Sequence, residues 1–541
     1  MKKIKYIILS MLAFSFIACE NEELEELRDL NSEDEIIILP ELTAGTADFS
    51  THVALGPSFT AGFTDGGLFI AAQENSFPNL ISKQFANAGG GLFTQPLMSD
   101  NFGGLALNGA RIASPRLVFG GAGPAPLESI IGPVTIGTDI VLNNPTGPFN
   151  NLGVPGAKSF HLIAPGYGNI ANLPNANPYA VRLTGNTPNA TLLELAVVQD
   201  PTFFTLGVIG GNDVLGYATS GGDGSNPITD SATFDTAMTA LINGLVSTGA
   251  KGALGNTPDL SNLPFFTTIP FNPLDPTDSA FGPLIPTLNG IFGQINQVFA
   301  FLNVPERSIV FSETVSSAVV IQDESLADLS VQITGVLNAS PTFPAFVESF
   351  GLPAEAAPLV ANLLGNTYGQ ARQANETDLL TLPSAAVIGT VNEDSVEFLM
   401  NQGLPEALAG QFSVEGISLP LADRWILLSG EQQEVATATA AHNATLASLA
   451  NANGLALVDL NAILDEAAST GIIFDDYNLN TDLVFGGLVS LDGIHLTGRG
   501  YAYMANKYLE KIDEIYGSNF VASGNVAKAN DYPTNYSPLL Q

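Results

Sequence analysis

Short apolar runs of strand length recur along the chain, and each is followed by glycine, proline or polar residues. Residues 51–56, 203–209 and 455–460 are such runs, and a fourth begins at Ala253 and leads into a loop. Short apolar runs bounded by turn residues are typical of buried strands. The pattern therefore predicts four short buried strands.

Segments with helical character lie between these runs. Apolar residues recur at helical spacing over residues 231–245, residues 437–453 are rich in alanine, and residues 500–516 carry the last strong helical pattern. Strands that alternate with helices predict an α/β fold in which a parallel sheet is covered on both faces. In such sheets functional side chains gather at the carboxyl ends of the strands.

Two long stretches interrupt this alternation. Residues 84–150 are rich in Gly, Asn and Pro, and residues 264–430 combine Pro-rich apolar loops with short helical candidates. Loops this long within a compact fold are usually functional. We therefore expect one domain over residues 48–541 with an insertion at about 265–430 that caps the active site. Its apolar segments would either bind an acyl chain or form ordinary core.

The N-terminus has the pattern of an export signal. Three lysines precede a 13-residue apolar run over residues 6–18, which is shorter than the roughly 20 residues that span a bilayer. Residues 1–18 are therefore expected to be a signal peptide. Cys19 is the only cysteine of the chain, so no internal disulfide can form. A small residue followed by cysteine at this place resembles the lipobox of bacterial lipoproteins, which implies a membrane anchor through an acylated Cys19.

A dense acidic run follows Cys19 over residues 20–35. Like charges at this density repel one another and favour a solvated tether, which we place at residues 19–47. The run also resembles the acidic signal that sends lipoproteins of the Bacteroidota to the cell surface. The expected location is the bacterial cell envelope, as an outer-membrane lipoprotein that faces either the periplasm or the cell exterior.

Composition narrows the classes of partner. The formal net charge is −36, yet charged residues make up only 13% of the chain and hydrophobic residues 45%. The acidic balance disfavours nucleic acid as a partner, because phosphate binding needs clustered Lys and Arg. The single cysteine and scattered histidines do not match metal-binding spacings, and no phosphate-binding glycine loop is present. We expect neither a metal nor a cofactor.

Several residues could supply acyl-transfer chemistry. Ser58 follows the first predicted strand as a nucleophile, and His495 is the only one of four histidines with a carboxylate three residues earlier in a Gly-containing loop, at Asp492. Such a carboxylate can orient the imidazole that takes the proton of the serine. The backbone N–H groups of Ser58 and Gly156 and the side-chain amide of Asn212 would meet the oxyanion.

The other three histidines are expected to play no chemical part. His52 is expected at a strand edge, His161 in a structural position, and His442 on the surface of a helix.

Together these motifs resemble the SGNH (GDSL-type) family of esterases and lipases. The matching blocks are residues 55–62, 151–156, 210–213 and 492–497, so the resemblance covers about residues 50–265 and 430–515. It implies a flavodoxin-like three-layer sandwich with a parallel sheet, a Ser58–His495–Asp492 triad and the oxyanion hole above. The family's usual Gly-Asp-Ser is Gly-Pro-Ser here, because Pro57 replaces the aspartate.

The expected function is therefore hydrolysis of a carboxylic ester, with a small-molecule or acyl-ester substrate. Two alternatives remain open. One is removal of acetyl groups from a polysaccharide by the same machinery. The other is a non-catalytic surface lipoprotein that binds a glycan or a partner on a hydrolase scaffold. The sequence does not specify the oligomeric state.

Overall fold

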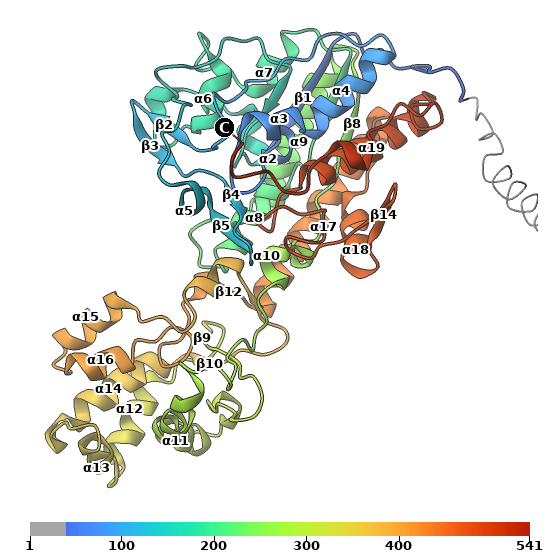
Figure 1. Cartoon of the computed structure of the whole chain (residues 1–541). Helices are drawn as coiled ribbons and strands as arrows, with labels where there is room; N and C mark the ends of the chain where they lie inside the picture. Colours follow the sequence, from blue (N-terminus) through green and yellow to red (C-terminus); the bar gives the residue numbers. More distant parts are fainter. Residues whose placement is uncertain (1–38, 541) are drawn as a thin grey trace, which may run out of the picture.

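The computed structural model describes residues 39–540 (Figure 1). The predicted signal peptide, Cys19 and the acidic run lie outside the described residues. Within residues 39–540, no helix is both long and apolar enough to cross a bilayer.

The protein is an α/β protein with a five-stranded, all-parallel sheet and many helical insertions. The strands are β1 (His52–Gly56), β6 (Asn151–Gly153), β7 (Phe203–Leu206), β8 (Lys251–Gly255) and β13 (Ala456–Val458). Their spatial order is β13-β8-β7-β1-β6, so β1 lies between β6 and β7. The chain order reverses beside β1, and ligands of parallel sheets bind at such reversal points, outside the carboxyl ends of the strands.

Helices pack on both faces of the sheet because successive strand residues point in opposite directions. Phe203 contributes to one apolar cluster and Phe204 to the other. The first cluster contains α4 (Phe77–Asn87) and α19 (Gly498–Tyr516). The second contains α7 (Leu192–Val197), α9 (Ser231–Val246) and the C-terminal half of α17 (Ser429–Asn453). Strands buried on both faces explain why the predicted runs are continuously apolar.

The helix ends follow local chemistry. Asp230 accepts a hydrogen bond from the backbone of Thr233 and begins α9, and Thr497 does the same for Gly500 in α19. The smaller helices of the sheet lobe are α2 (Ser58–Ala61), α3 (Ile70–Glu74), α6 (Pro178–Thr184), α8 (Gly211–Thr219), α10 (Pro264–Thr267) and α18 (Leu460–Ser469).

Residues 269–428 form a second lobe with a core of its own (Figure 1). Its helices are α11 (Ile285–Phe301), α12 (Ser330–Ala339), α13 (Phe343–Glu348), α14 (Ala357–Tyr368), α15 (Glu393–Asn401) and α16 (Glu406–Gln411). Two strand pairs accompany them: β9 (Val320–Gln322) with β10 (Ala371–Gln373), and β11 (Leu379–Leu380) with β12 (Ile426–Leu427). Phe292 and Phe343 are fully buried in this core, which accounts for the apolar content of the stretch.

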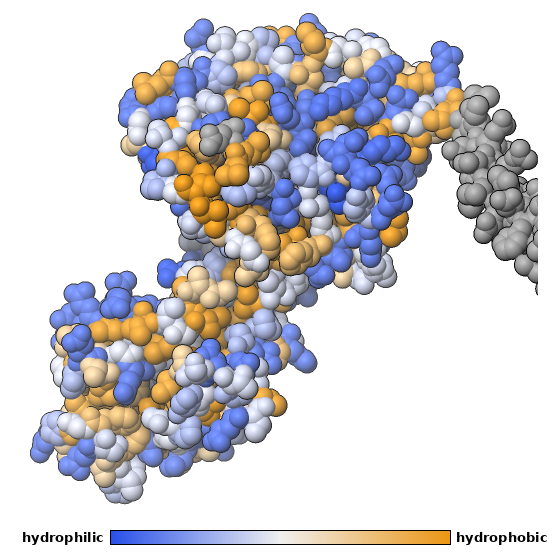
Figure 2. Space-filling model, in the orientation of Figure 1, coloured by the Kyte–Doolittle hydropathy of each residue, from blue (hydrophilic) through white to orange (hydrophobic). Residues whose placement is uncertain are grey.

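Small hairpins occupy the Gly- and Pro-rich stretch 84–150. They are β2 (Leu105–Leu107) with β3 (Ala110–Ala113), and β4 (Leu117–Phe119) with β5 (Pro124–Pro126), followed by α5 (Leu127–Ile131). Figure 2 shows apolar side chains gathered on the face that carries α5, β4 and β5. A last hairpin, β14 (Ile472–Phe474) with β15 (Tyr477–Leu479), precedes the segment that contains His495.

Candidate active site

Ser58 is the first residue of α2, immediately beyond the carboxyl end of β1. All five residues of β1 are buried, which fixes the position of the turn that follows. A β-carbon on Gly56 (φ +149°) would collide with Thr60 Oγ1, so this turn requires glycine. Pro57 caps α2 through its carbonyl, which accepts hydrogen bonds from the backbones of Thr60 and Ala61 at 3.1 and 3.3 Å.

Ser58, His495 and Asp492 form a continuous chain of hydrogen bonds. Ser58 Oγ lies 2.8 Å from His495 Nε2, and His495 Nδ1 lies 2.9 Å from Asp492 Oδ2. With the ring proton on Nδ1 toward the carboxylate, Nε2 is free to accept the serine proton. Ser58 and His495 are only 5% and 8% exposed. The arrangement therefore joins a hydroxyl, a base and an orienting carboxylate with little competition from water.

The carboxylate of Asp492 is held by several further donors. The backbone N–H groups of Ile494 and His495 donate to Oδ1, and that of Gly66 donates to Oδ2. Ser490 Oγ also donates to Oδ1, at 3.1 Å. Burial alone would raise the pKa of Asp492, but the positive charge available on His495 and these hydrogen bonds hold it well below its usual value. Asp492 therefore stays charged beside the imidazole.

Asp65 belongs to the same network and was not predicted from the sequence. Its carboxyl oxygen accepts a hydrogen bond from the backbone of Leu491 at 3.1 Å, and its own N–H donates to Ser490 Oγ at 3.0 Å. Burial, reinforced by the negative charge of Asp492, raises the pKa of Asp65 to about 7, although Arg116 opposes the shift. The only local signal is the turn-forming pair Asp65-Gly66.

Two phenylalanines flank the imidazole of His495. The ring centroids of Phe63 and Phe59 lie 4.8 and 5.2 Å from that of His495. They restrict the rotation of the ring, so its two nitrogens stay directed toward Ser58 and Asp492.

Asn212 and Gly156 follow the two strands that flank β1. Asn212 is the second residue of α8, just beyond β7, and its Nδ2 donates to the carbonyl of Ala157 at 3.0 Å. An amide has two N–H groups, so one remains for a ligand. Gly156 lies in the loop after β6 with φ +79°, beside Ala157. Ser58 and Asn212 line one pocket. Gly156 does not line that pocket, and it is connected to Asn212 through the neighbouring Ala157.

Asp213 braces this arrangement and was also not predicted to have a role. It is 1% exposed, and its carboxylate accepts hydrogen bonds from the backbone and the hydroxyl of Ser159 at 2.9 and 2.7 Å. The bonds tie the loop after β6 to the start of α8. They therefore set the distance between the Gly156 and Asn212 segments.

The pocket at Ser58 is apolar apart from the candidate catalytic groups. Among its lining residues, all within the described range, only Ser58 and Asn212 have polar side chains. The lining consists of Pro57, Ser58, Phe59, Val208, Gly211, Asn212, Leu215, Pro258, Leu260, Leu263 and Ile494. No residue of the second lobe contributes to it.

The remaining histidines lie elsewhere. His161 stacks on Tyr167, and burial lowers its pKa to about 4, which agrees with a structural position. His52 is the first residue of β1, an interior strand of the sheet, and its ring nitrogens lie within hydrogen-bond distance of Ser82 and Thr205. His442, expected on a helix surface, is buried and stacks on Phe234 because α17 packs against α9.

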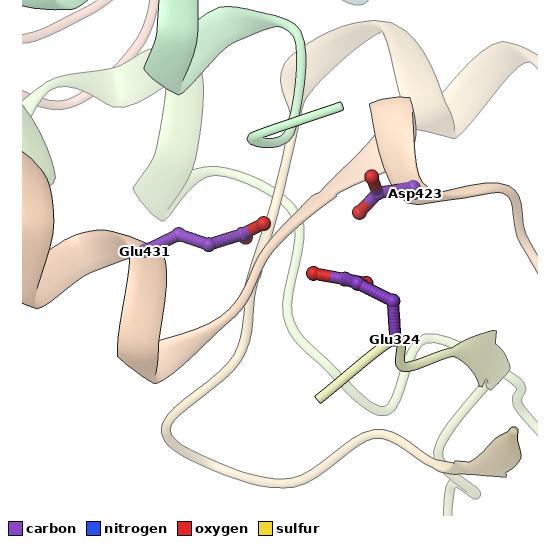
Figure 3. Close-up of side chains that lie close together, drawn as sticks. All are labelled: Glu324, Asp423 and Glu431. Carbon is purple, nitrogen blue, oxygen red and sulfur yellow. The ribbon is translucent and has the colours of Figure 1, made fainter. Parts of the chain in front are cut away.

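A separate acidic cluster lies where the two lobes meet. Glu324, Asp423 and Glu431 direct their carboxylates toward one another, close enough to hold one ion between them (Figure 3). Carboxylate oxygens are suitable ligands for Ca²⁺, but a group of acids alone does not define a metal site. Burial and the neighbouring acids raise the pKa of Asp423 to about 7 and also raise that of Glu431. Protons shared among the three carboxyl groups therefore explain their close approach just as well as a bound ion does.

Comparisons of this chain with family models, with curated proteins and with solved structures found no match.

Proposed function

We propose that this protein is a serine hydrolase of carboxylic esters that belongs to the SGNH (GDSL-type) family. The observation that carries the proposal is the hydrogen-bond chain from Ser58 Oγ through His495 to Asp492, at 2.8 and 2.9 Å. A nucleophile joined to a base, with the base joined to an orienting carboxylate, is the arrangement that acyl transfer requires.

The geometry supports a two-step reaction. Ser58 Oγ attacks the ester carbonyl while His495 Nε2 takes its proton, and Asp492 stabilises the imidazolium that forms. The tetrahedral intermediate collapses when His495 returns the proton to the leaving alcohol. Water then attacks the acyl-serine while His495 takes its proton, and His495 gives that proton to Ser58 Oγ as the carboxylic acid departs. The low pKa of Asp492 suits its part, because a charged partner is needed at each imidazolium stage.

The oxyanion would be met by donors from three neighbouring loops. The N–H of Ser58, that of Gly156 and the free amide proton of Asn212 follow β1, β6 and β7, the three adjacent strands at the reversal point. Preorganised donors of this kind each lower the barrier by about 2.7–4 kcal/mol. Pro57 has no N–H to offer, but the N–H of Ser58 is retained, so the substitution leaves these donors intact.

The strand order supports the finer description of the fold. Numbered along the chain, the five strands follow the spatial order 2-1-3-4-5, which is the flavodoxin-like order. Helices on both faces complete the three-layer arrangement proposed for this family. Attachment to a bacterial outer membrane through a lipid on Cys19 is likewise a proposal, which rests on the sequence of residues 1–35.

An apolar ester suits the site better than an acetylated sugar. The pocket offers hydrogen-bonding side chains only at the candidate catalytic residues. Sugar hydroxyls placed against the remaining apolar lining would lose their hydrogen bonds to water without replacement, which is unfavourable. The polysaccharide deacetylase alternative is therefore less well supported.

The test combines turnover with covalent labelling. The purified protein should hydrolyse p-nitrophenyl esters and should be labelled once by a fluorophosphonate, with the adduct on Ser58 by mass spectrometry. Ser58→Ala should abolish both. Exposed Ser469 on α18 provides the control, since Ser469→Ala should change neither result. A protein that cleaves no ester and carries no adduct on Ser58 would refute the proposal.

A further inference from the structure

A second apolar cavity adjoins the pocket at Ser58. It lies between α18, α19 and the loops around residues 258–263 and 488–496, and we call it the adjoining cavity. Its volume is about 60 Å³, several times the roughly 10–15 Å³ that one water molecule needs. The two spaces share the side chains of Phe59, Val208, Pro258, Leu263 and Ile494 as a common wall.

The lining of the adjoining cavity selects for hydrocarbon. Its far wall, the part that it does not share with the pocket at Ser58, includes Leu488, Leu464 of α18 and Met504 of α19. All three side chains are buried. Among its lining residues, which all fall within 39–540, none is charged, and the hydroxyl of Tyr503 is the one polar side-chain group. A charged or hydroxylated ligand would leave its polar groups unpaired there, whereas an alkyl chain would not.

The shared wall places this cavity next to the reacting atoms. Phe59 directly follows the nucleophile Ser58, and Ile494 directly precedes His495. Both side chains are partly exposed, in contrast to the buried residues of the far wall. A chain attached to an ester held at Ser58 would pass these two side chains to enter the cavity.

The position of this space, rather than its size, distinguishes it from other cavities, since one of about 150 Å³ lies within the second lobe. Protein interiors are close-packed, and voids larger than a water molecule are few. Here such a void lies beside a candidate nucleophile rather than at a remote point of the core. The apolar segments of the second lobe, which could have bound an acyl chain, line neither space.

We propose that the adjoining cavity binds the apolar chain of the ester substrate and limits its length, with Met504 and Leu464 as the residues that set the limit. The inference rests on the proposed function and adds the substrate class: esters with an extended alkyl chain rather than acetyl esters. The chain can belong to the acid or to the alcohol of the ester, because either would extend from the same carbonyl.

The test compares chain-length profiles of cavity-filling variants. We would measure kcat/KM for p-nitrophenyl acetate, butyrate, octanoate and decanoate, and for ethyl and octyl acetate. Met504→Phe and Leu464→Phe fill the cavity from different helices. Each methylene that loses its apolar surroundings costs about fourfold. The long-to-short ratio should therefore fall by about tenfold or more in each variant. Ile515→Phe, on the exposed face of α19, should leave the ratio unchanged.

The outcomes separate this inference from the proposed function. A lower ratio in the p-nitrophenyl series assigns the chain to the acid, and a lower ratio only among the alkyl acetates assigns it to the alcohol. Unchanged ratios in both series, with active enzyme, would overturn the inference and leave the esterase proposal standing. If no ester is cleaved, binding of decanoate by calorimetry decides the matter: it should occur in Ser58→Ala and be lost in Ser58→Ala/Met504→Phe.

Discussion

The carboxyl group of Asp492 and two carboxyl groups of the acidic cluster, those of Asp423 and Glu431, have pKa values that move in opposite directions. Burial pushes the pKa upward in both places. At Asp492 the imidazole of His495 and four N–H or O–H donors reverse the effect. At Asp423 the nearby groups are mostly further acids, so the pKa rises to about 7.

The difference shows that the partners of a buried carboxyl decide its charge. Asp492 is surrounded by donors that favour the ionised form, which a base-orienting carboxylate needs. The acidic cluster is surrounded by like charges that favour the protonated form.

Removing the imidazole should have the largest effect. His495→Ala and Ser58→Ala should each lower kcat by roughly 10⁴- to 10⁶-fold, and the double variant should be little worse than either, because the two residues act as one unit. Steady-state kinetics on a p-nitrophenyl ester would measure this, with circular dichroism as a check on folding. Losses that multiply in the double variant would contradict a shared step.

Neutralising Asp492 should be the next most severe change. Asp492→Asn keeps an acceptor for the backbone donors but removes the charge that fixes the imidazole, so kcat should fall on the order of 10³- to 10⁴-fold. Asp492→Asn should also change the stability of the folded state, in a direction that the lowered pKa of Asp492 determines. A lowered pKa stabilises the folded state above about pH 4, near the usual value of 3.8, and this gain is lost in stronger acid.

Thermal unfolding of Asp492→Asn against the original chain from pH 7 to pH 2.5 would test that direction. The variant should be less stable at pH 7, and the difference should narrow in acid. A gap that widens on acidification would contradict the assigned charge of Asp492.

The sequence indicated the α/β class correctly, because strands buried on both faces leave continuous apolar runs. The runs at residues 51–56, 203–209 and 455–460 all contain strands of the sheet. Strand β6 was missed, since its three residues, Asn151–Gly153, lie between Pro148 and Pro155 and form no apolar run. Helix α17 begins at Ser429, eight residues before the alanine-rich pattern that indicated it.

The sequence indicated the residues of the candidate site but not the residues that hold them in place. Ser58, Asn212, Asp492 and His495 lie in short motifs, and the order of these motifs along the chain and their places after predicted strands led us to propose them together. Asp65 contacts a loop more than 400 residues away, and local spacing holds no record of such a contact. The same limit applies to the second lobe. An apolar helix pattern shows that a face is buried but not what covers it, and here the helices bury one another.

Loosening the support of Asp492 should have a moderate effect. Ser490→Ala removes the hydroxyl that donates to Asp492 Oδ1 and accepts from the backbone of Asp65. One hydrogen bond to a charged group contributes about 1.5–3 kcal/mol, so kcat/KM should fall by roughly tenfold or more. Ser469→Ala, at the exposed end of α18, is the matched control. Equal activities of the two variants would show that Ser490 does not position Asp492.

The smallest predicted effect concerns the acidic cluster and is a gain of stability. Glu431 accepts a hydrogen bond from the backbone of Leu428 at 2.7 Å while it faces Asp423 and Glu324. Glu431→Gln keeps an acceptor for that N–H and removes one negative charge. When folding raises the pKa of a carboxyl group, the folded state loses stability as the pH rises from about 4 through that raised pKa. The variant should therefore gain most above pH 7.

Thermal unfolding at pH 8 and pH 5 measures this gain, which should raise the melting temperature by about 2–4 °C at pH 8 and be much smaller at pH 5. Exposed Glu397 on α15 provides the control, since Glu397→Gln removes the same charge away from the cluster. A gain of equal size at both pH values would mean that general charge, rather than the crowding of these three carboxyls, explains the effect. A loss at pH 8 would mean that the cluster attracts a positive partner when ionised, and the contrast with Asp492 would then disappear.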